Sequence, residues 1–274
     1  MLKIAITGST GMIGSRMVEL LKNDFIFVPL TQEQLDITNR ETVFKTLSEI
    51  DFDIFFHLAA YTNVDGAETQ KELCYKINVE GTKNVFEATQ ANGKQFVLVS
   101  TDFVFDGSTP PYTETSDPNP IGYYGQTKYE AEQLVKGQAM IIRPSYPYRK
   151  EFTEKKDFVR VLKSLLEQGK ELNMITDSLI TPTFIDDFAF AVRELLQNFT
   201  TDIFHVVGAD SLSPFEAGKL IAQTFHLDES LVQPTTYDEY FAGKAKRPKN
   251  ARIISLHTNS YPMNTFKEGL KQLL

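Results

Sequence analysis

The chain begins with Met1-Leu2-Lys3-Ile4-Ala5-Ile6-Thr7-Gly8-Ser9-Thr10-Gly11-Met12-Ile13-Gly14, and this stretch decides the fold. The apolar run predicts a buried strand, and the glycines that follow have the spacing G-x-x-G-x-x-G. Between a strand and a helix, the first glycine permits a tight turn, another lets the backbone approach a pyrophosphate, and the last allows close helix packing. The helix N-terminus then faces the phosphates. The position after the first strand favours a dinucleotide site over an ordinary glycine-rich turn.

The first half of the chain continues this alternation of strands and helices. Apolar runs predict strands at 2–7, 25–30, 53–59, 95–100 and 138–143, and helical spacing predicts helices at 12–22, 39–50, 72–91 and 123–136. Uninterrupted apolar strands separated by helices are typical of a parallel sheet covered on both faces. We therefore predict an α/β fold in which residues 1–150 form a doubly wound Rossmann domain that binds NAD(P).

The pattern changes after about residue 150. Helices are expected near 156–168, 186–198 and 214–226, with a strand at 203–207. We interpret residues 151–274 mainly as a smaller C-terminal substrate-binding lobe. Return of part of this segment to the sheet is an open alternative.

The composition excludes several classes of protein. The net charge is −8, which disfavours a sequence-independent nucleic-acid binder. The single cysteine, Cys74, cannot form an intrachain disulfide and fits the reducing cytoplasm. No stretch reaches the roughly 18 apolar residues of a membrane helix, so no membrane partner is expected. The four histidines are scattered and the acids have no metal-ligand spacing, so no metal site is expected.

A tyrosine and a lysine share one face of the helix expected at 123–136. Tyr124 and Lys128 are four residues apart, and a lysine ammonium beside a phenol favours the phenolate, which lowers the tyrosine pKa. The same spacing recurs at Tyr146/Lys150 and at Tyr240/Lys244. Only the first pair opens a helix within the predicted sheet domain, so we take Tyr124 and Lys128 as the catalytic pair.

The hydroxyl pair Ser100-Thr101 ends the strand at 95–100. This is the carboxyl edge of the predicted sheet, where ligands bind in doubly wound folds. Thr101 can therefore hydrogen-bond a substrate carbonyl while Tyr124 donates a proton to it. A plain strand end is the alternative reading of Ser100-Thr101 when the pair is considered alone.

Several motifs in order resemble the dTDP-4-dehydrorhamnose reductase family of the extended short-chain dehydrogenase/reductases. Besides the glycine turn they are Asp36-Ile37-Thr38, 58–68 (LAAYTNVDGAE), Asn78, 100–107 (STDFVFDG), 118–120 (PNP), 124–128 (YGQTK), 143–146 (RPSY), 181–183 (TPT), 204–208 (FHVVG) and 246–248 (KRP). The resemblance covers nearly the whole chain.

The resemblance implies a role for each matching position. Tyr124 is the implied proton donor to a C4 carbonyl, Thr101 polarises that carbonyl, and Lys128 holds the nicotinamide ribose. Further implied cofactor residues are Gly8, Gly11, Met12, Ile13 and Gly14 at the pyrophosphate, Asp36 and Ile37 at the adenine, and Leu58, Ala59, Ala60 and Tyr61 after the third strand. Thr101 and Asp102 are expected to contact the sugar.

The second half is expected to complete the sugar-nucleotide pocket. Tyr146 stands where the family commonly has tryptophan and would form an aromatic wall. Arg247, in the basic run 244–249, is a candidate for the substrate diphosphate, because arginine grips phosphate oxygens in a bidentate manner. A solvated basic stretch is the alternative reading of this run.

Two departures bear on chemistry. Asp102 is followed by Phe103, whereas related 4,6-dehydratases carry an acid there, so dehydration is disfavoured. Leu30-Thr31-Gln32 ends the second strand without a carboxylate for a ribose 2′-hydroxyl or an arginine for a 2′-phosphate. The family favours NADP(H), and NAD(H) stays open.

The resemblance therefore implies NAD(P)H-dependent reduction of dTDP-4-dehydrorhamnose to dTDP-L-rhamnose. One alternative is a nucleotide-sugar 4-epimerase or another deoxysugar reductase. A second is an NADP-binding regulatory protein similar to the beta subunit of methionine adenosyltransferase. A homodimer is one option for the assembly.

Overall fold

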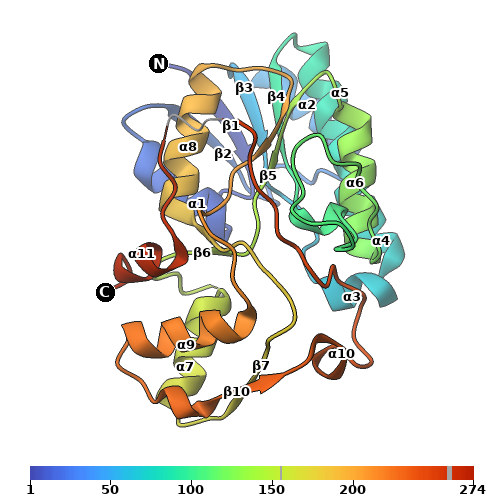
Figure 1. The fold of residues 1–274 in the computed structure, drawn as a ribbon. Helices are drawn as coiled ribbons and strands as arrows, with labels where there is room; N and C mark the ends of the chain where they lie inside the picture. Colours follow the sequence, from blue (N-terminus) through green and yellow to red (C-terminus); the bar gives the residue numbers. More distant parts are fainter. Residues whose placement is uncertain (155, 258–260) are drawn as a thin grey trace.

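The computed structural model describes residues 1–154, 156–257 and 261–274, and at its centre is a six-stranded parallel sheet (Figure 1). The strand order is β2-β1-β3-β4-β5-β9. These strands are β1 (Lys3–Thr7), β2 (Ile26–Leu30), β3 (Ile54–His57), β4 (Gln95–Val99), β5 (Met140–Arg143) and β9 (Ile203–His205). The five strands predicted in the first half are all present, and the order is that of a doubly wound fold.

Helices cover both faces of this sheet. One face carries α1 (Met12–Leu21) and α8 (Ile185–Gln197), and the other carries α2 (Arg40–Glu49), α5 (Thr82–Ala91) and α6 (Tyr123–Val135) (Figure 1). Side chains alternate along a strand, so β1 contributes to the cores on both faces. Ile4 and Ile6 pack in the core under α1 and α8, and Ala5 packs in the core under α2, α5 and α6. The predicted Rossmann-type fold is confirmed.

The helical stretch predicted at 72–91 contains an irregular turn. It is built from α4 (Lys71–Tyr75), the π-helical turn η1 (Lys76–Gly81) and α5. A π turn inserts an extra residue into a helix and is frequent at functional sites. The short helix α3 (Val64–Thr69) precedes it and begins at Asn63, whose side chain accepts the Gly66 N–H at 2.9 Å.

The second half forms a small lobe and also returns to the sheet. The lobe contains α7 (Phe158–Glu167), α9 (Pro214–Thr224), α11 (Phe266–Lys271), the 3-10 turn η3 (Glu229–Leu231), and the parallel pairs β7 (Leu172–Ile175) with β10 (Val232–Thr235) and β6 (Pro147–Tyr148) with β8 (Thr183–Phe184). Its core packs around Tyr148, Val159, Ile221 and Phe266. From the same half, β9 pairs with β5, so residues after 150 complete the sheet itself.

A segment after α10 (Tyr237–Tyr240) runs from the small lobe back along the sheet domain, and we call residues 241–254 the strap (Figure 1). It bridges Leu179 through Asn250 and Tyr112 through Ile253. Gly122 permits its close approach, since a Cβ there would lie 2.5 Å from the Lys246 carbonyl oxygen. The strap therefore carries the basic run 244–249 to the edge of the sheet domain.

Candidate active site

The glycine turn between β1 and α1 has the geometry that a diphosphate needs. Gly8 has a φ of 69°, and its carbonyl accepts the Gly11 N–H at 2.9 Å. A Cβ on Gly14 would lie 2.3 Å from the Gly8 carbonyl oxygen, so the turn and the helix meet backbone to backbone. α1 begins without a side-chain cap and without an acid in its first turn. Its first N–H groups are thus left for an anion.

A buried hydroxyl supports the same fit. Ser9 Oγ is buried and has no hydrogen-bond partner among the described residues. A buried polar atom of this kind calls for a ligand or a water molecule. The turn therefore fits a dinucleotide diphosphate, and the predicted contact residues that it brings together are Gly8, Gly11, Met12, Ile13 and Gly14.

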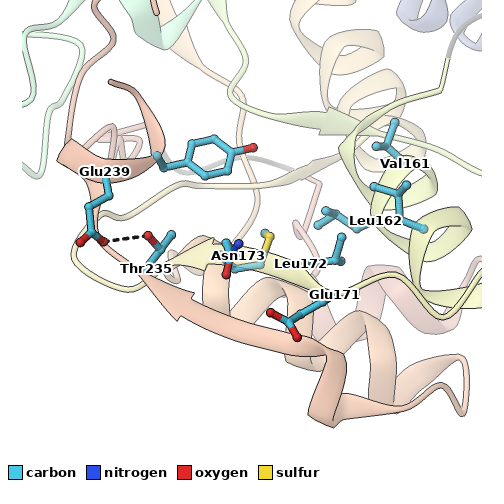
Figure 2. Close-up of a pocket in the computed structure, with 10 residues that line it drawn as sticks. Val161, Leu162, Glu171, Leu172, Asn173, Thr235 and Glu239 are labelled. Atoms are coloured by element: carbon cyan, nitrogen blue, oxygen red, sulfur yellow. Dashed lines mark hydrogen bonds between the residues drawn. The ribbon is translucent and has the colours of Figure 1, made fainter. Parts of the chain in front are cut away.

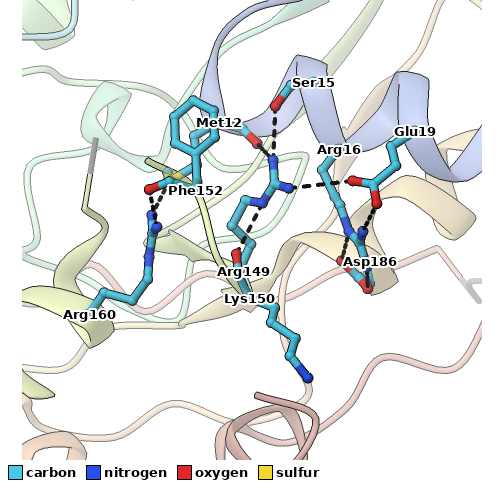
Figure 3. A network of polar contacts seen from close by, with 9 residues as sticks. All are labelled: Met12, Ser15, Arg16, Glu19, Arg149, Lys150, Phe152, Arg160 and Asp186. Atoms are coloured by element: carbon cyan, nitrogen blue, oxygen red, sulfur yellow. Dashed lines mark hydrogen bonds and ion pairs between the residues drawn. The ribbon is translucent and has the colours of Figure 1, made fainter. Parts of the chain in front are cut away.

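Arg149, which the sequence analysis missed, lies behind this turn. Its Nη1 donates to the Met12 carbonyl at 3.1 Å and to Ser15 Oγ at 2.9 Å (Figure 3). Its Nη2 lies 3.5 Å from Glu19 Oε2. This guanidinium ties the first turn of α1 to the start of the small lobe. No local pattern marks Arg149, because Met12 lies 137 positions away.

The residues expected at the adenine lie in the loop after β2. Asp36 Oδ1 accepts from the Thr38 N–H at 2.9 Å and from Thr38 Oγ1 at 2.8 Å, which is a local turn typical of aspartate. The Ile37 side chain is buried, and its carbonyl accepts Asn84 Nδ2 at 3.0 Å. Both residues are thus held by their own neighbours, and their contact with an adenine stays a prediction.

Asn78 of η1 joins the segment after β3 to α6, the helix of Tyr124 and Lys128. Its Oδ1 accepts the Tyr61 N–H at 2.7 Å, and its Nδ2 donates to the Tyr61 carbonyl at 3.2 Å and to Thr127 Oγ1 at 3.0 Å. Thr127 lies on α6 just before Lys128. Asn78 thereby fixes the loop that holds the predicted cofactor residues Leu58, Ala59, Ala60 and Tyr61. The sequence motif contains Asn78, but only its contacts reveal this role.

Thr101, Tyr124 and Lys128 come together at the carboxyl end of β4. Burial raises the pKa of the Tyr124 phenol and the Thr101 side chain lowers it, so these two side chains are neighbours. The buried Lys128 Nζ donates to the Val99 carbonyl at 2.8 Å. Gly125 lets α6 pack closely against the segment after β4, since a Cβ there would lie 2.3 Å from the Phe103 carbonyl oxygen. The three residues predicted as catalytic therefore share one site.

Burial controls the protonation of this group. It raises the pKa of the Tyr124 phenol, and the nearby Asp102 carboxyl raises it further. Burial lowers the pKa of Lys128 to about 8, against a smaller opposite effect of Glu132. The expectation that Lys128 lowers the Tyr124 pKa is wrong for the protein alone, because desolvation dominates and the ammonium is bonded to the Val99 carbonyl. Tyr124 is thus a protonated phenol at neutral pH, the state that a proton donor requires.

Asp102 follows Thr101 and is the first residue of the 3-10 turn η2 (Asp102–Val104). The side chain accepts from Thr101 Oγ1 at 3.0 Å and from Ser145 Oγ at 2.7 Å, and the residue is 2% exposed. Burial raises the pKa of Asp102 to about 6, although both hydrogen bonds act in the opposite direction. Both carboxyl oxygens are engaged within the protein, and contact of Asp102 with a sugar stays a prediction.

A cleft of about 270 Å³ lies at the small lobe, and the structure brings Tyr146 and Arg247 together in its lining. Its other lining residues include Phe158, Ile175, Tyr237 and Phe241. Tyr146 has a φ of 40°, a costly conformation for a tyrosine and one that is frequent at ligand sites. Ser145, the residue before Tyr146, donates to Asp102 at 2.7 Å, so this wall of the cleft lies near the predicted catalytic group.

Arg247 is anchored in this cleft. Its Nη2 donates to Asp65 Oδ2 at 2.8 Å, its Nη1 donates to the Ala245 carbonyl at 2.8 Å, and its guanidinium lies 4.8 Å from the Phe241 ring centroid. These contacts leave other N–H groups of its planar fork for an anion. They place Arg247 in a built wall, and its contact with a diphosphate stays a prediction.

A second hollow of about 460 Å³ lies beside the cleft on α7 and β7 (Figure 2). Its polar end carries Glu239, which accepts from Thr235 Oγ1 at 2.9 Å. It shares Val161, Leu162, Met174 and Tyr240 with the cleft. Although this hollow is larger, none of the predicted site residues is among its described lining residues. We therefore take the cleft of Tyr146 as the candidate substrate site.

The buried histidines are neutral. Burial lowers the pKa of His57 to about 3 and that of His205 to about 4. Within the described ranges, no group of three or more His, Cys, Asp or Glu side chains has an arrangement suited to a metal ion.

The sequence matches the family model of the RmlD substrate binding domain over residues 2–274. The chain belongs to this family. It is 30% identical to the dTDP-4-dehydrorhamnose reductase of Sinorhizobium fredii over 267 residues, which cover 92% of this chain and 88% of that protein. It is 28% identical to methionine adenosyltransferase 2 subunit beta of Mus musculus over 292 residues, covering 99% and 87%.

A solved structure agrees with this membership. The dTDP-4-dehydrorhamnose reductase of Bacillus anthracis, in complex with NADP, superimposes with a TM-score of 0.90 at 33% identity, covering 99% of this chain and 98% of that one. These relatives confirm the predicted family, the fold and the enzyme class, an NAD(P)-dependent oxidoreductase of this type.

Proposed function

We propose that this RmlD-family protein uses NADPH to reduce the C4 keto group of a dTDP-4-keto-6-deoxysugar, converting dTDP-4-dehydrorhamnose to dTDP-L-rhamnose. One observation carries the proposal: Thr101, Tyr124 and Lys128 meet at the sheet edge that also holds the glycine turn. Support for a substrate site at this edge comes from Ser145, which precedes Tyr146 of the cleft and donates to Asp102 at 2.7 Å. A 30% identical relative that is named for this reaction supports the same substrate.

The cofactor site is proposed at the glycine turn. Gly8, Gly11 and Gly14 would hold the diphosphate at the start of α1, and Lys128 would hold the nicotinamide ribose. The bound cofactor supplies the hydride. The NADP in the related Bacillus anthracis structure favours NADP(H), while the loop after β2 leaves NAD(H) as the alternative.

Tyr124 is proposed as the proton donor. Burial keeps its phenol neutral, and the Thr101 side chain is its neighbour. In the reducing direction Tyr124 gives its proton to the C4 oxygen, while Thr101 donates a hydrogen bond to the same oxygen. A positioned general acid contributes about 10²–10⁴-fold to the rate.

The substrate is proposed to lie along the cleft. Thr101 and Asp102 would face the sugar, Tyr146 would form an aromatic wall, and Arg247 would bind the diphosphate. Support comes from the anchored guanidinium of Arg247, because a held planar fork loses less freedom when it binds two phosphate oxygens.

The partners follow from the same proposal. A dTDP-sugar is the small-molecule partner, the cytoplasm is the proposed location, and a homodimer is the proposed assembly. The described part of the chain contains no helix long and apolar enough to cross a bilayer.

A regulatory, NADP-binding role is the second candidate. Methionine adenosyltransferase 2 subunit beta of Mus musculus is 28% identical over 99% of this chain, and this relative supports the second candidate. The complete set of Thr101, Tyr124 and Lys128 favours turnover. Another deoxysugar reductase or a 4-epimerase would differ in the stereochemistry of the product.

The test is to incubate the purified protein with NADPH and the 4-keto sugar nucleotide and to identify the product. Tyr124→Phe should lose 10²–10⁴-fold of turnover and still bind NADPH. Tyr123→Phe is the matched control on the same helix, since that ring contacts Lys71 with its centroid 5.1 Å from Nζ. Equal losses in both variants, or NADPH binding with no turnover of any 4-keto sugar, would reject the reductase.

A further inference from the structure

The Thr101 hydroxyl has no free proton in this structure. A threonine hydroxyl has one donor and two acceptor positions. Thr101 Oγ1 donates to Asp102 Oδ1 at 3.0 Å and accepts the Phe103 N–H at 3.3 Å. Thr101 cannot donate to a substrate carbonyl until this arrangement changes.

The protonation of Asp102 determines whether the Thr101 hydroxyl can donate in another direction. An ionised carboxylate only accepts hydrogen bonds, so it takes the Thr101 proton. Turning that proton toward a substrate would leave Asp102 Oδ1 buried without a donor, because the residue is 2% exposed and Ser145 Oγ serves the other oxygen. An unpaired buried carboxylate oxygen is unfavourable.

We propose that Asp102 is a proton-controlled positioning residue, which lets Thr101 donate to the substrate C4 oxygen only while Asp102 itself carries a proton. With a proton on Oδ1, Asp102 donates to Thr101. Thr101 then accepts from Asp102 and from the Phe103 N–H, and its own proton points to the carbonyl. Tyr124 donates its own proton to the same oxygen. Every group is paired, and Asp102 keeps its proton throughout. The inference rests on the proposed reduction.

Among the groups around Asp102, Asp102 itself is the one whose protonation changes near pH 6. The titratable side chains that face it are Tyr124 from α6 and Tyr146 from the segment after β5, and burial raises the pKa of both phenols. They therefore stay neutral across the working range. The cations of the region are bonded elsewhere, Lys128 to the Val99 carbonyl and Arg247 to Asp65.

The pH profile of kcat/KM for the keto sugar tests the inference. The pKa of Asp102 is raised to about 6, so Asp102 is protonated below that pH and ionised above it. Activity of the wild type should fall about tenfold per pH unit above 6. Asp102→Asn should remove this limb, because the amide can donate to Thr101 while its oxygen accepts from Ser145. The kcat/KM profile of the variant, relative to its own maximum, should stay flat up to about pH 8, where Lys128 loses its proton.

Ser145→Ala gives a second, graded result. The Ser145 hydrogen bond lowers the Asp102 pKa, so its loss should move the limb to higher pH. The ratio of kcat/KM at pH 7 to kcat/KM at pH 5.5 should be higher in both variants than in the wild type. For Asp102→Asn this ratio should be about tenfold higher. Asp187→Asn is the matched control, because Asp187 is also 2% exposed but bonds Asn264 at 2.9 Å. It should leave the limb unchanged.

Carbon-13 NMR of the aspartate carboxyls supplies a readout that needs no turnover. One signal should titrate near pH 6, disappear in Asp102→Asn and move upward in Ser145→Ala. A signal with the ordinary aspartate pKa, or an unchanged limb in both variants, would overturn the inference. Loss of activity at every pH in Asp102→Asn with nucleotide binding intact would overturn it too. If Asp102→Asn does not fold, Ser145→Ala and the NMR titration decide.

Discussion

Replacing Glu132 with glutamine is expected to destabilise this protein by several kcal/mol. Glu132 of α6 and Arg143 of β5 form a bidentate ion pair, with Nε to Oε1 at 2.9 Å and Nη2 to Oε2 at 2.6 Å. Both side chains are 1% exposed. Nη1 of Arg143 lies 3.3 Å from Nε2 of His205, which burial keeps neutral with a pKa of about 4. The carboxylate of Glu132 is therefore the charge that balances Arg143.

The size of the effect follows from this burial. Removing one partner of a buried pair leaves an uncompensated charge and costs about 3–5 kcal/mol. For a protein of this size, that corresponds to a fall in Tm of roughly 10 °C. Glu132 also raises the pKa of Lys128 against desolvation. Without it, Lys128 loses its proton below about pH 8, so activity near neutral pH should fall as well.

Urea and thermal unfolding measure the loss. Asp186→Asn is the control, since its bidentate pair with Arg16 has side chains 18–19% exposed and should cost less, about 1–2 kcal/mol. The double variant Glu132→Leu with Arg143→Met should recover most of the stability, because no charge is left unpaired. The reasoning is refuted if Glu132→Gln costs no more than Asp186→Asn, or if the double variant is no more stable than Glu132→Gln.

Two further outcomes are expected. Gly14→Ala should abolish NADPH binding in calorimetry, because its Cβ would lie 2.3 Å from the Gly8 carbonyl oxygen; wild-type affinity would show that the turn does not hold the cofactor. Asp65→Asn should raise the KM for the sugar nucleotide about two- to five-fold by releasing Arg247. Asp177→Asn, which breaks the neighbouring 2.6 Å pair on the strap, should not, and equal effects would remove Asp65 from the site.

The sequence alone determined the sheet domain and gave the residues that are proposed for its chemistry. The glycine turn and the strand–helix alternation depend on residues a few positions apart, so hydrophobic periodicity and turn chemistry are sufficient to predict them. Tyr124 and Lys128 lie on adjacent turns of one helix. Thr101 was found because the carboxyl ends of parallel strands share one edge. Short strands such as β7, with mixed polarity, carry no comparable local pattern and were not predicted.

Only the tertiary structure decided which distant groups act on this chemistry. Arg247 meets Asp65 across 182 positions, and Ser145 meets Asp102 across 43. The direction of the Tyr124 pKa in the protein alone was predicted wrongly for the same reason. The sequence shows that a lysine is near, but desolvation and the bond of that lysine to the Val99 carbonyl come from packing around the site. Burial and long-range hydrogen bonds depend on which segments meet in space, and local periodicity does not encode that meeting.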